Sequence, residues 1–235
     1  MNRPLCTIVG MGPGNGFSIA KRFAKEGHHL FLVARNADHL QAAKLNLLSD
    51  GASSVEVFAA DLSVRSEVPL AINAINETFT HVNVLVNNAG LFLPGTMMEE
   101  NEGQFEHLLQ TNLTSAYHVT RGLWDRMKGV ERAHVFNMCS IASITAYAAG
   151  GSYSVVKFGL LGFSKSLRLE GVPHGIRVSS VLPGATLTDS WAGVDLPESR
   201  FMRADDVAET IFTAFEINDR TVMEEIVLRP LLGDL

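Results

Sequence analysis

Seven short apolar runs alternate along the chain with longer stretches of helical periodicity. The runs are rich in β-branched or aromatic residues and mostly apolar, which is typical of strands buried on both faces of a sheet. Strict alternation favours right-handed β-α-β units and a parallel sheet with helices on both faces. The sequence therefore predicts strands at 6–9, 29–33, 55–60, 82–86, 134–138, 176–182 and 225–228, and helices at 17–26, 37–49, 68–79, 104–127 and 151–170.

A chain of 235 residues suits either one large domain or two small ones. No low-complexity linker divides it and no internal repeat is present. The hydrophobic fraction of 46% is enough to fill a sizeable core. We therefore expect a single doubly wound α/β domain over residues 1–235, with a parallel sheet of about seven strands.

Charge and composition exclude several classes of function. A net charge of −6 argues against nucleic acid or an anionic membrane surface as the main partner. No apolar stretch is long enough to span a bilayer, and the N-terminus is interpreted as a first strand rather than a signal peptide. Cys6 and Cys139 lie in apolar runs and fit a reducing compartment, so we expect a cytoplasmic protein. The histidines and carboxylates show no metal-ligand spacing.

A glycine-rich segment, "VGMGPGNGF", joins the first strand to the first helix. Gly10, Gly14 and Gly16 permit a tight turn, a close approach of backbone to a pyrophosphate, and close packing of the helix on the strand. Exposed amides at the helix N-terminus then favour an anion. An ordinary glycine-rich turn is the alternative, but the strand-turn-helix context favours nucleotide binding.

The end of the second strand bears on the choice of cofactor. Ala34 cannot bond a ribose 2′-hydroxyl and leaves room for a phosphate, to which Arg35 can offer a charge-assisted fork. NADP(H) is therefore favoured over NAD(H), with a solvated surface arginine as the alternative. Asp61, after the third strand, is placed either to contact the adenine edge or to cap the next helix.

The segment "YSVVK" places Tyr153 and Lys157 four residues apart, one turn from each other on the same helix face. A packed tyrosine and a lysine that reaches to solvent are the ordinary explanations of such a pair. A nearby ammonium would also lower the pKa of the phenol, which suits a group that exchanges protons.

With these segments the chain resembles the classical short-chain dehydrogenase/reductase family, and the resemblance covers nearly all of it. The shared pieces stand in family order: the turn glycines, "NNAG" at 87–90, Asn112, Ser140, "YSVVK" at 153–157 and "LPG" at 182–184. The resemblance implies a Rossmann fold with cofactor contacts at Gly10, Gly14, Asn15, Gly16, Phe17, Arg35, Asp61, Leu62, Asn88, Ala89, Gly90, Tyr153, Lys157, Pro183, Gly184, Thr186 and Thr188.

The resemblance also implies a division of catalytic roles. Tyr153 is the general acid/base, and Lys157 both lowers its pKa and holds the nicotinamide ribose. Ser140 polarises the substrate carbonyl, and Asn112 holds a water that links Lys157 to solvent. The resemblance also implies that the backbone of "NNAG" lines the adenosine side of the cleft, with Asn87 the likeliest contact.

Some positions depart from the family pattern. Val9 stands in place of a hydroxyl residue, and Gly12, Pro13 and Asn15 change the shape expected of the turn. The expected substrate lid, about 188–204, is short and carries Trp191. Five apolar residues are candidates to line the substrate pocket, but they could equally belong to the core or to an interface: Leu91, Phe92, Leu93, Ile141 and Trp191.

We therefore predict an NADP(H)-dependent oxidoreductase that reduces a ketone or aldehyde, or catalyses the reverse reaction. A 3-oxoacyl thioester is one candidate substrate, and a small or aromatic carbonyl another. The alternative is a catalytically silent NADP-binding sensor or scaffold of the same fold. The resemblance further implies a homodimer or homotetramer built on the helices expected at 104–127 and 151–170.

Overall fold

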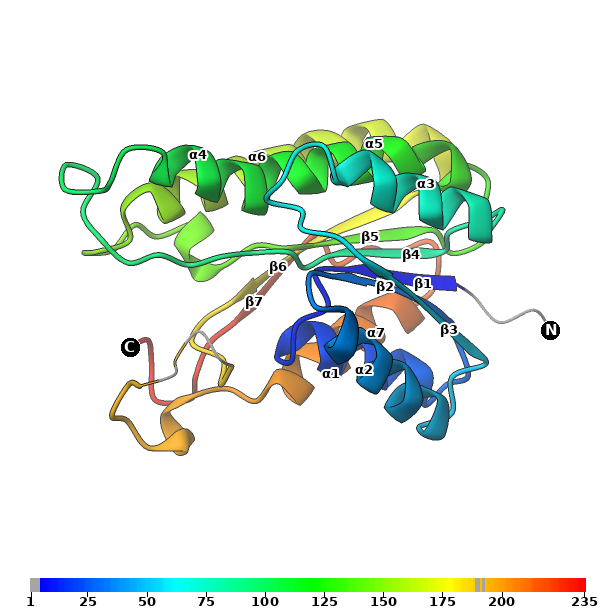
Figure 1. The fold of residues 1–235 in the computed structure, drawn as a ribbon, viewed down its shortest axis with the longest axis horizontal. Coiled ribbons are helices and arrows are strands. Elements are labelled where there is room, and N and C mark those ends of the chain that lie inside the picture. Colours follow the sequence, from blue (N-terminus) through cyan, green and yellow to red (C-terminus); the bar gives the residue numbers. More distant parts are fainter. Residues whose placement is uncertain (1–4, 189–190, 192) are drawn as a thin grey trace.

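The structure is a computed structural model that describes residues 5–188, 191 and 193–235. A seven-stranded sheet, in which every neighbouring pair is parallel, has the order β3-β2-β1-β4-β5-β6-β7 and lies between two layers of helices (Figure 1). Its strands are β1 (Leu5–Val9), β2 (His29–Ala34), β3 (Ser54–Ala59), β4 (Val84–Asn87), β5 (His134–Met138), β6 (Arg177–Pro183) and β7 (Glu225–Leu228).

The helices divide between the two faces of the sheet. One face carries α1 (Asn15–Ala24), α2 (Ala37–Ser49) and α7 (Ala204–Glu216). The other carries α3 (Val68–Thr78), α4 (Gln104–Leu109), α5 (Ser115–Met127) and α6 (Gly151–Gly171) (Figure 1). A buried core lies on each side, because the strands are apolar on both faces.

Aromatic side chains pack α1 against α7 on one face of the sheet. Phe23 of α1 is fully buried, and its ring lies 5.1 Å from that of Phe212 and 5.6 Å from that of Phe215, both on α7. Burial of one such side chain contributes about 1.5–3 kcal/mol, so this contact holds α1 and α7 together. It thereby fixes the N-terminus of α1 relative to the sheet.

The order of the strands reverses between β1 and β4. The chain leaves β1 towards β2 on one side and returns at β4 on the other, so the loops after these two strands separate at the carboxyl edge. Ligands of open α/β sheets bind at such a switch point. Gly10, with φ of 87°, passes so close to the next loop that a Cβ atom there would overlap the backbone of Ala89. The crossing of the two loops therefore requires glycine at position 10.

The predicted fold class is confirmed, and the expected strands and helices agree with the observed ones to within two residues at almost every end. The main difference is at 104–127, where α4 and α5 are joined by a π-helical turn, Gln110–Thr114. No helix in the described part of the chain is both long and apolar enough to cross a membrane.

Candidate active site

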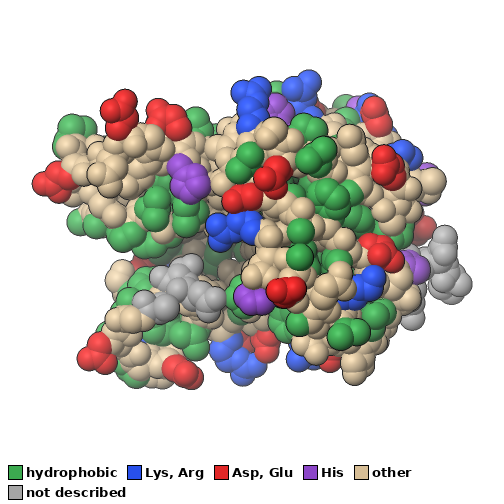
Figure 2. All heavy atoms as spheres, viewed as in Figure 1, with side chains coloured by type: hydrophobic (Ala, Val, Ile, Leu, Met, Phe, Trp, Pro, Cys, Tyr) green, Lys and Arg blue, Asp and Glu red, His purple; other side chains and the backbone are tan. Residues whose placement is uncertain are grey.

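A hollow opens at the carboxyl edge of the sheet. Figure 2 shows it between the layer that contains α4 and α6 and the opposite layer, which contains the segment around 193–203. The loops that follow β1, β4, β5 and β6 all begin at this edge, because all strands are parallel. The residues predicted for the site are carried by these loops and by the first turns of α1 and α6.

The glycine-rich turn leaves the N-terminus of α1 open. Gly14 is the N-cap and the helix has no side-chain cap. A Cβ atom on Gly16 would lie 2.9 Å from Gly10 O, so the turn closes tightly on itself. Asn15 Oδ1 is buried without a hydrogen-bond partner. Uncapped amides and an unpaired polar atom fit the pyrophosphate of a dinucleotide, which would be held here by backbone N–H groups.

Arg35 and Asp61 lie close together after β2 and β3. The pKa of the Asp61 carboxyl is lowered. Burial alone would raise this pKa, but the hydrogen bonds from Ser63 and the positive charges of Arg35 and His107 outweigh the effect of burial. Asp61 Oδ1 accepts from Ser63 N at 2.9 Å and Ser63 Oγ at 2.7 Å. Arg35 is exposed, and within the described residues it forms no hydrogen bond or ion pair of its own. Its guanidinium is therefore available to an anion at this end of the cleft.

Asn112 lies in the π-helical turn and is fully buried. Its Nδ2 donates to Leu91 O and Leu108 O, both at 3.0 Å, and its Oδ1 accepts from Leu91 N at 3.2 Å. A Cβ atom on Gly90 would lie 3.1 Å from Asn112 Oδ1 and 3.7 Å from Lys157 Nζ. The structure thus brings Asn112 and Lys157 to the same glycine. Single-turn π-helices frequently occur at functional sites.

Ser140 follows β5 and caps a short 3₁₀ turn. Its Oγ accepts from Ala142 N at 3.1 Å, while its own amide donates to Ser143 Oγ at 3.2 Å. Because this cap uses the oxygen only as an acceptor, the hydroxyl proton remains to be donated to another oxygen at the site. Ser143 was not predicted as part of the site. The spacing of Ser140 and Ser143 is nevertheless that of a capping box, in which each side chain bonds the backbone of the other end of the turn.

Tyr153 stands in the first turn of α6, hydrogen-bonded to Ser140 through their side chains. Burial raises the pKa of its phenol above the ordinary value, and the bond to Ser140 offsets only part of this rise. The prediction of a lowered pKa is therefore wrong for this structure. The cause is desolvation, which disfavours the phenolate. A T-shaped contact with Phe92, with ring centroids 4.9 Å apart, closes off one side of the phenol.

Lys157 is buried one turn further along α6. Its Nζ donates to Met138 O at 2.8 Å and lies 5.6 Å from the centroid of the Tyr153 ring. Burial lowers its pKa to about 8. The ammonium is therefore held by the end of β5 beneath the tyrosine, with further N–H donors available for a ligand.

The "NNAG" segment divides between core and cleft. Asn88 Nδ2 donates to Gly10 O at 2.5 Å and so joins the loops after β1 and β4. That the backbone of Asn87 lines the adenosine side of the cleft stays a prediction, but the side chain of Asn87 lies in the core. Its side chain is buried, and its Nδ2 donates to Asn137 Oδ1 at 2.7 Å and Thr120 Oγ1 at 2.9 Å. Two further residues predicted to contact the cofactor, Leu62 and Phe17, belong to the core. The side chain of Leu62 is buried in it, and Phe17 of α1 packs against it.

The segment after β6 lies against β7 and the glycine-rich turn. Gly184 N donates to Leu228 O at 2.8 Å and Thr186 Oγ1 to Gly184 O at 3.1 Å, while Thr186 also pairs with Met202. A Cβ atom on Gly14 would lie 2.6 Å from the Thr188 methyl group, so this segment crosses the glycine-rich turn. Trp191 packs its ring 5.2 Å from that of Phe201. Residues 189, 190 and 192 of the expected lid lie outside the described residues.

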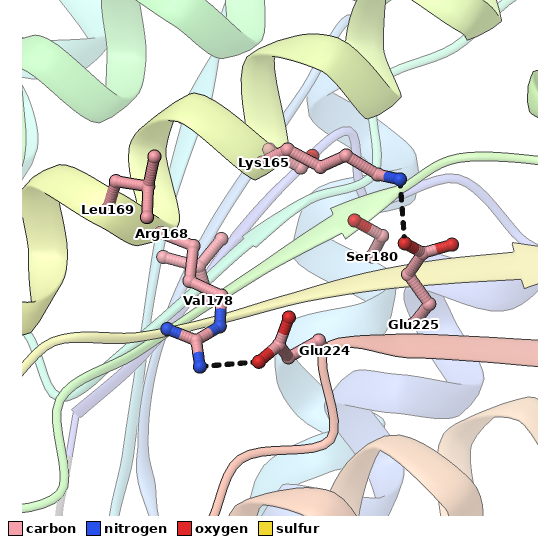
Figure 3. Close-up of a pocket in the computed structure, with 8 residues that line it drawn as sticks. Lys165, Arg168, Leu169, Val178, Ser180, Glu224 and Glu225 are labelled. Atoms are coloured by element: carbon pink, nitrogen blue, oxygen red, sulfur yellow. Dashed lines mark ion pairs between the residues drawn. The ribbon is translucent and has the colours of Figure 1, made fainter.

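A separate cavity of about 380 Å³ lies away from this cleft, between the second half of α6 and the start of β7 (Figure 3). Ion pairs between Lys165 and Glu225 and between Arg168 and Glu224 cross its mouth. The charged groups are thus paired with one another, and none of the predicted site residues lines the cavity. No group of residues suited to hold a metal ion occurs in the part of the chain that the structure describes.

Comparison with known proteins agrees with this arrangement. The family model described as short chain dehydrogenase matches residues 5–198. A sepiapterin reductase from Chlorobaculum tepidum is 32% identical over 97% of this chain and 96% of its own. The chain therefore belongs to the short-chain dehydrogenase/reductase family and is an oxidoreductase of that family.

Solved structures extend the likeness to the fold. An alcohol dehydrogenase from the archaeon Thermococcus sibiricus, complexed with 5-hydroxy-NADP, superposes with a TM-score of 0.92 at 24% identity over 99% of both chains. L-Sorbose reductase from Gluconobacter frateurii, complexed with NADPH and L-sorbose, has a TM-score of 0.88 at 26% identity over 98% of this chain and 96% of its own.

Proposed function

We propose that this protein is an NADP(H)-dependent carbonyl reductase that converts a ketone or aldehyde to an alcohol. The observation that carries the proposal is the hydrogen bond between Ser140 and Tyr153 directly above buried Lys157. Three groups able to polarise a carbonyl, donate a proton and hold a positive charge are thereby gathered at the carboxyl edge of the sheet.

Each of the four catalytic candidates has a separate role in this reaction. Ser140 donates its hydroxyl proton to the carbonyl oxygen and orients the substrate, and Tyr153 transfers its phenolic proton to that oxygen as negative charge develops. Lys157 stabilises the phenolate that remains, and Asn112 holds a water through which the proton is replaced from solvent. The hydride for the carbonyl carbon would come from NADPH once it is bound. Burial holds the phenol of Tyr153 in its protonated form, the form that can donate a proton to a carbonyl oxygen.

The cofactor preference rests on Arg35. Its guanidinium is exposed just after β2, at the strand end that binds the adenosine ribose in dinucleotide-binding folds, and Ala34 before it offers no side-chain acceptor to a 2′-hydroxyl. L-Sorbose reductase, which was solved with NADPH, gives additional support. The pyrophosphate would be held at the N-terminus of α1 and the nicotinamide near Thr186 and Thr188.

We also propose that copies of the chain associate through the outer face of α5 and α6. Tyr117, Val155 and Phe158 lie on these helices and each is between 41% and 48% exposed. Large apolar side chains gathered on neighbouring helices favour a protein interface.

The experiment that tests the activity follows nicotinamide absorbance with NADPH and four carbonyls. These are sepiapterin, L-sorbose, acetoacetyl-coenzyme A and 1-phenyl-1,2-propanedione, which represent a pterin, a sugar, a 3-oxoacyl thioester and an aromatic diketone. Oxidation of NADPH that depends on a carbonyl supports the enzyme. Tight NADPH binding without turnover of any of them would favour the silent sensor.

A further inference from the structure

The first turn of α6, which carries Tyr153, has no cap from its own sequence. Its N-cap, Gly150, offers no side chain, and no acidic residue occurs in the first turn. The first amides of a helix have no partner within the helix and are favourably placed beside a negative charge. A helix of 21 residues at the active site therefore needs its cap from elsewhere in the chain.

Glu100, on the loop between β4 and α4, supplies that cap. Its Oε1 accepts from Ser152 N at 2.8 Å, and its Oε2 accepts from Ser152 Oγ. Ser152 is buried and directly precedes Tyr153. Both oxygens of one carboxylate thus hold the residue next to the phenol, and bonds to an ionised acceptor are stronger than neutral ones.

A second contact joins the same two segments. Gly95 N donates to Ala149 O at 3.0 Å, in the turn that leads into α6. Ala149 adopts φ of 57°, a conformation that an L-residue keeps only when its surroundings impose it. Gly151 has φ of 39°, and a Cβ atom there would lie 2.6 Å from Gly95 O and overlap Glu100 Oε1. The turn is therefore held tightly against the loop that carries Glu100.

The same loop also touches the phenol directly, through the contact of Phe92 with the Tyr153 ring. We propose that Glu100 is a positioning residue for Tyr153: it fixes the first turn of α6 so that the phenol stays bonded to Ser140 and aimed at the substrate. This inference rests on the proposed role of Tyr153. Glu100 itself touches neither substrate nor cofactor.

Three variants test this role in the reduction of whichever of the four carbonyls the wild-type enzyme reduces fastest. Glu100→Ala removes both bonds and should lower kcat by about 10- to 100-fold, the effect of a small misplacement of a reacting group. Glu100→Gln keeps an acceptor for Ser152 N and a donor for Ser152 Oγ, so kcat should stay within about threefold of wild type. Glu102→Ala, an exposed acidic residue of the same loop, is the control and should leave kcat unchanged.

Two further measurements separate positioning from general stability. The KM for NADPH should change by less than about twofold in Glu100→Ala, because the groups proposed to hold the cofactor phosphates, the N-terminus of α1 and Arg35, belong to other segments. In a Tyr153→Phe background, Glu100→Ala should cause no further loss of the residual rate, since it acts through the phenol. Rates are expressed per site that binds NADPH in a fluorescence titration, which removes any unfolded fraction.

The inference would be overturned if Glu100→Ala left kcat unchanged. It would also be overturned if Glu100→Ala lowered the rate by the same factor in the Tyr153→Phe background as in the wild-type enzyme. Both outcomes count even if the melting temperature falls. Should Glu100→Ala fail to fold, Ser152→Ala replaces it. That variant keeps the amide bond and loses only the hydroxyl bond, so a smaller fall in kcat supports the role and no fall rejects it. Failure of the proposed function would look different, because Tyr153→Phe itself would then remain active.

Discussion

Lys157 Nζ lies 5.6 Å from the centre of the Tyr153 ring but donates its hydrogen bond to Met138 O, 2.8 Å away. The two side chains therefore form a stacked pair on one face of α6, anchored to the end of β5. Burial acts on both in the direction that disfavours charge: it raises the pKa of the phenol and lowers that of the ammonium. At neutral pH the phenol is therefore protonated, while the ammonium, with a pKa of about 8, still keeps most of its charge. This is the state in which a carbonyl reductase begins its reaction.

Tyr153→Phe should lower kcat by at least about 10²- to 10⁴-fold, the usual contribution of a positioned proton donor. The ring and its contact with Phe92 are kept, so the affinity for NADPH and the melting temperature should stay close to wild type. Steady-state kinetics, fluorescence titration and thermal unfolding measure the three quantities. A rate near that of wild type would mean that Tyr153 is only a packed tyrosine.

Affinity for NADPH should decrease as pH rises through about 8, where buried Lys157 loses its proton. Burial lowers the pKa of Lys157 from the ordinary 10.5 of a lysine to about 8, so the ammonium is present below about pH 8 and lost above it. Titration of NADPH fluorescence at a series of pH values measures the effect. Lys157→Ala should bind NADPH weakly with no such dependence, whereas the same pH dependence in that variant would assign it to another group.

Tyr153 and Lys157 should also behave as a unit in catalysis. Lys157→Ala removes both the charge beneath the phenol and the ribose contact, so it should lose rate and cofactor affinity together. The double variant with Tyr153→Phe should be little slower than the slower single variant. Multiplicative losses of kcat in the double variant would show that the two residues act independently.

Arg35→Ala should weaken NADPH binding by about 1.5–3 kcal/mol, a factor of roughly 10 to 150 in Kd, as for loss of a hydrogen bond to a charged group. NADH carries no 2′-phosphate, so its Kd should hardly change. Fluorescence titration with both cofactors gives the comparison. Lys25→Ala, which removes an exposed charge at the far end of α1, is the control. Equal losses for both cofactors would reject Arg35 as the phosphate-binding residue.

The sequence predicts the fold well because its strands are buried on both faces. The run 29–33 is apolar at four of its five positions, and the observed β2 extends it by one residue only. The π-helical turn at Gln110–Thr114 was not predicted, since the pattern of apolar residues is compatible with an unbroken helix. The glycine-rich turn and the tyrosine–lysine spacing are local, so they place cofactor and catalytic candidates at the expected edge.

The remaining details of the site depend on tertiary structure. Asn87 and Asn88 are adjacent and chemically identical, yet side chains alternate along a strand, so only Asn88 reaches the glycine-rich turn. The pairing of Asn87 with Asn137 across β4 and β5 decides which one is buried. Likewise, the burial that raises the pKa of Tyr153 and the cap from Glu100, 52 residues before Ser152, leave no signal in the local sequence.

Stability should decrease as pH falls below about 6.5, because His134 is fully buried and burial, with the charge of Arg177, lowers its pKa well below that value. The unfolded chain binds a proton there that the folded chain excludes, which gives a slope of up to about 1.4 kcal/mol per pH unit. Urea unfolding at a series of pH values between about 5 and 7.5 measures it. His134→Gln should flatten the slope, whereas replacing exposed His81 with Gln should not. An unaltered slope in His134→Gln would assign the effect to other groups.

Association through α5 and α6 should give the wild-type protein a mass in solution above the 25.5 kDa of one chain. Phe158→Asp places a charge within the exposed apolar face, and burying that charge in an interface is costly, so the variant should dissociate. Leu45→Asp makes the same kind of change on α2, where Leu45 is 70% exposed, and should leave the mass unaltered. Light scattering at micromolar concentration compares the three proteins. A monomeric wild type, or a Phe158→Asp variant that remains fully associated, would remove α5 and α6 as the interface.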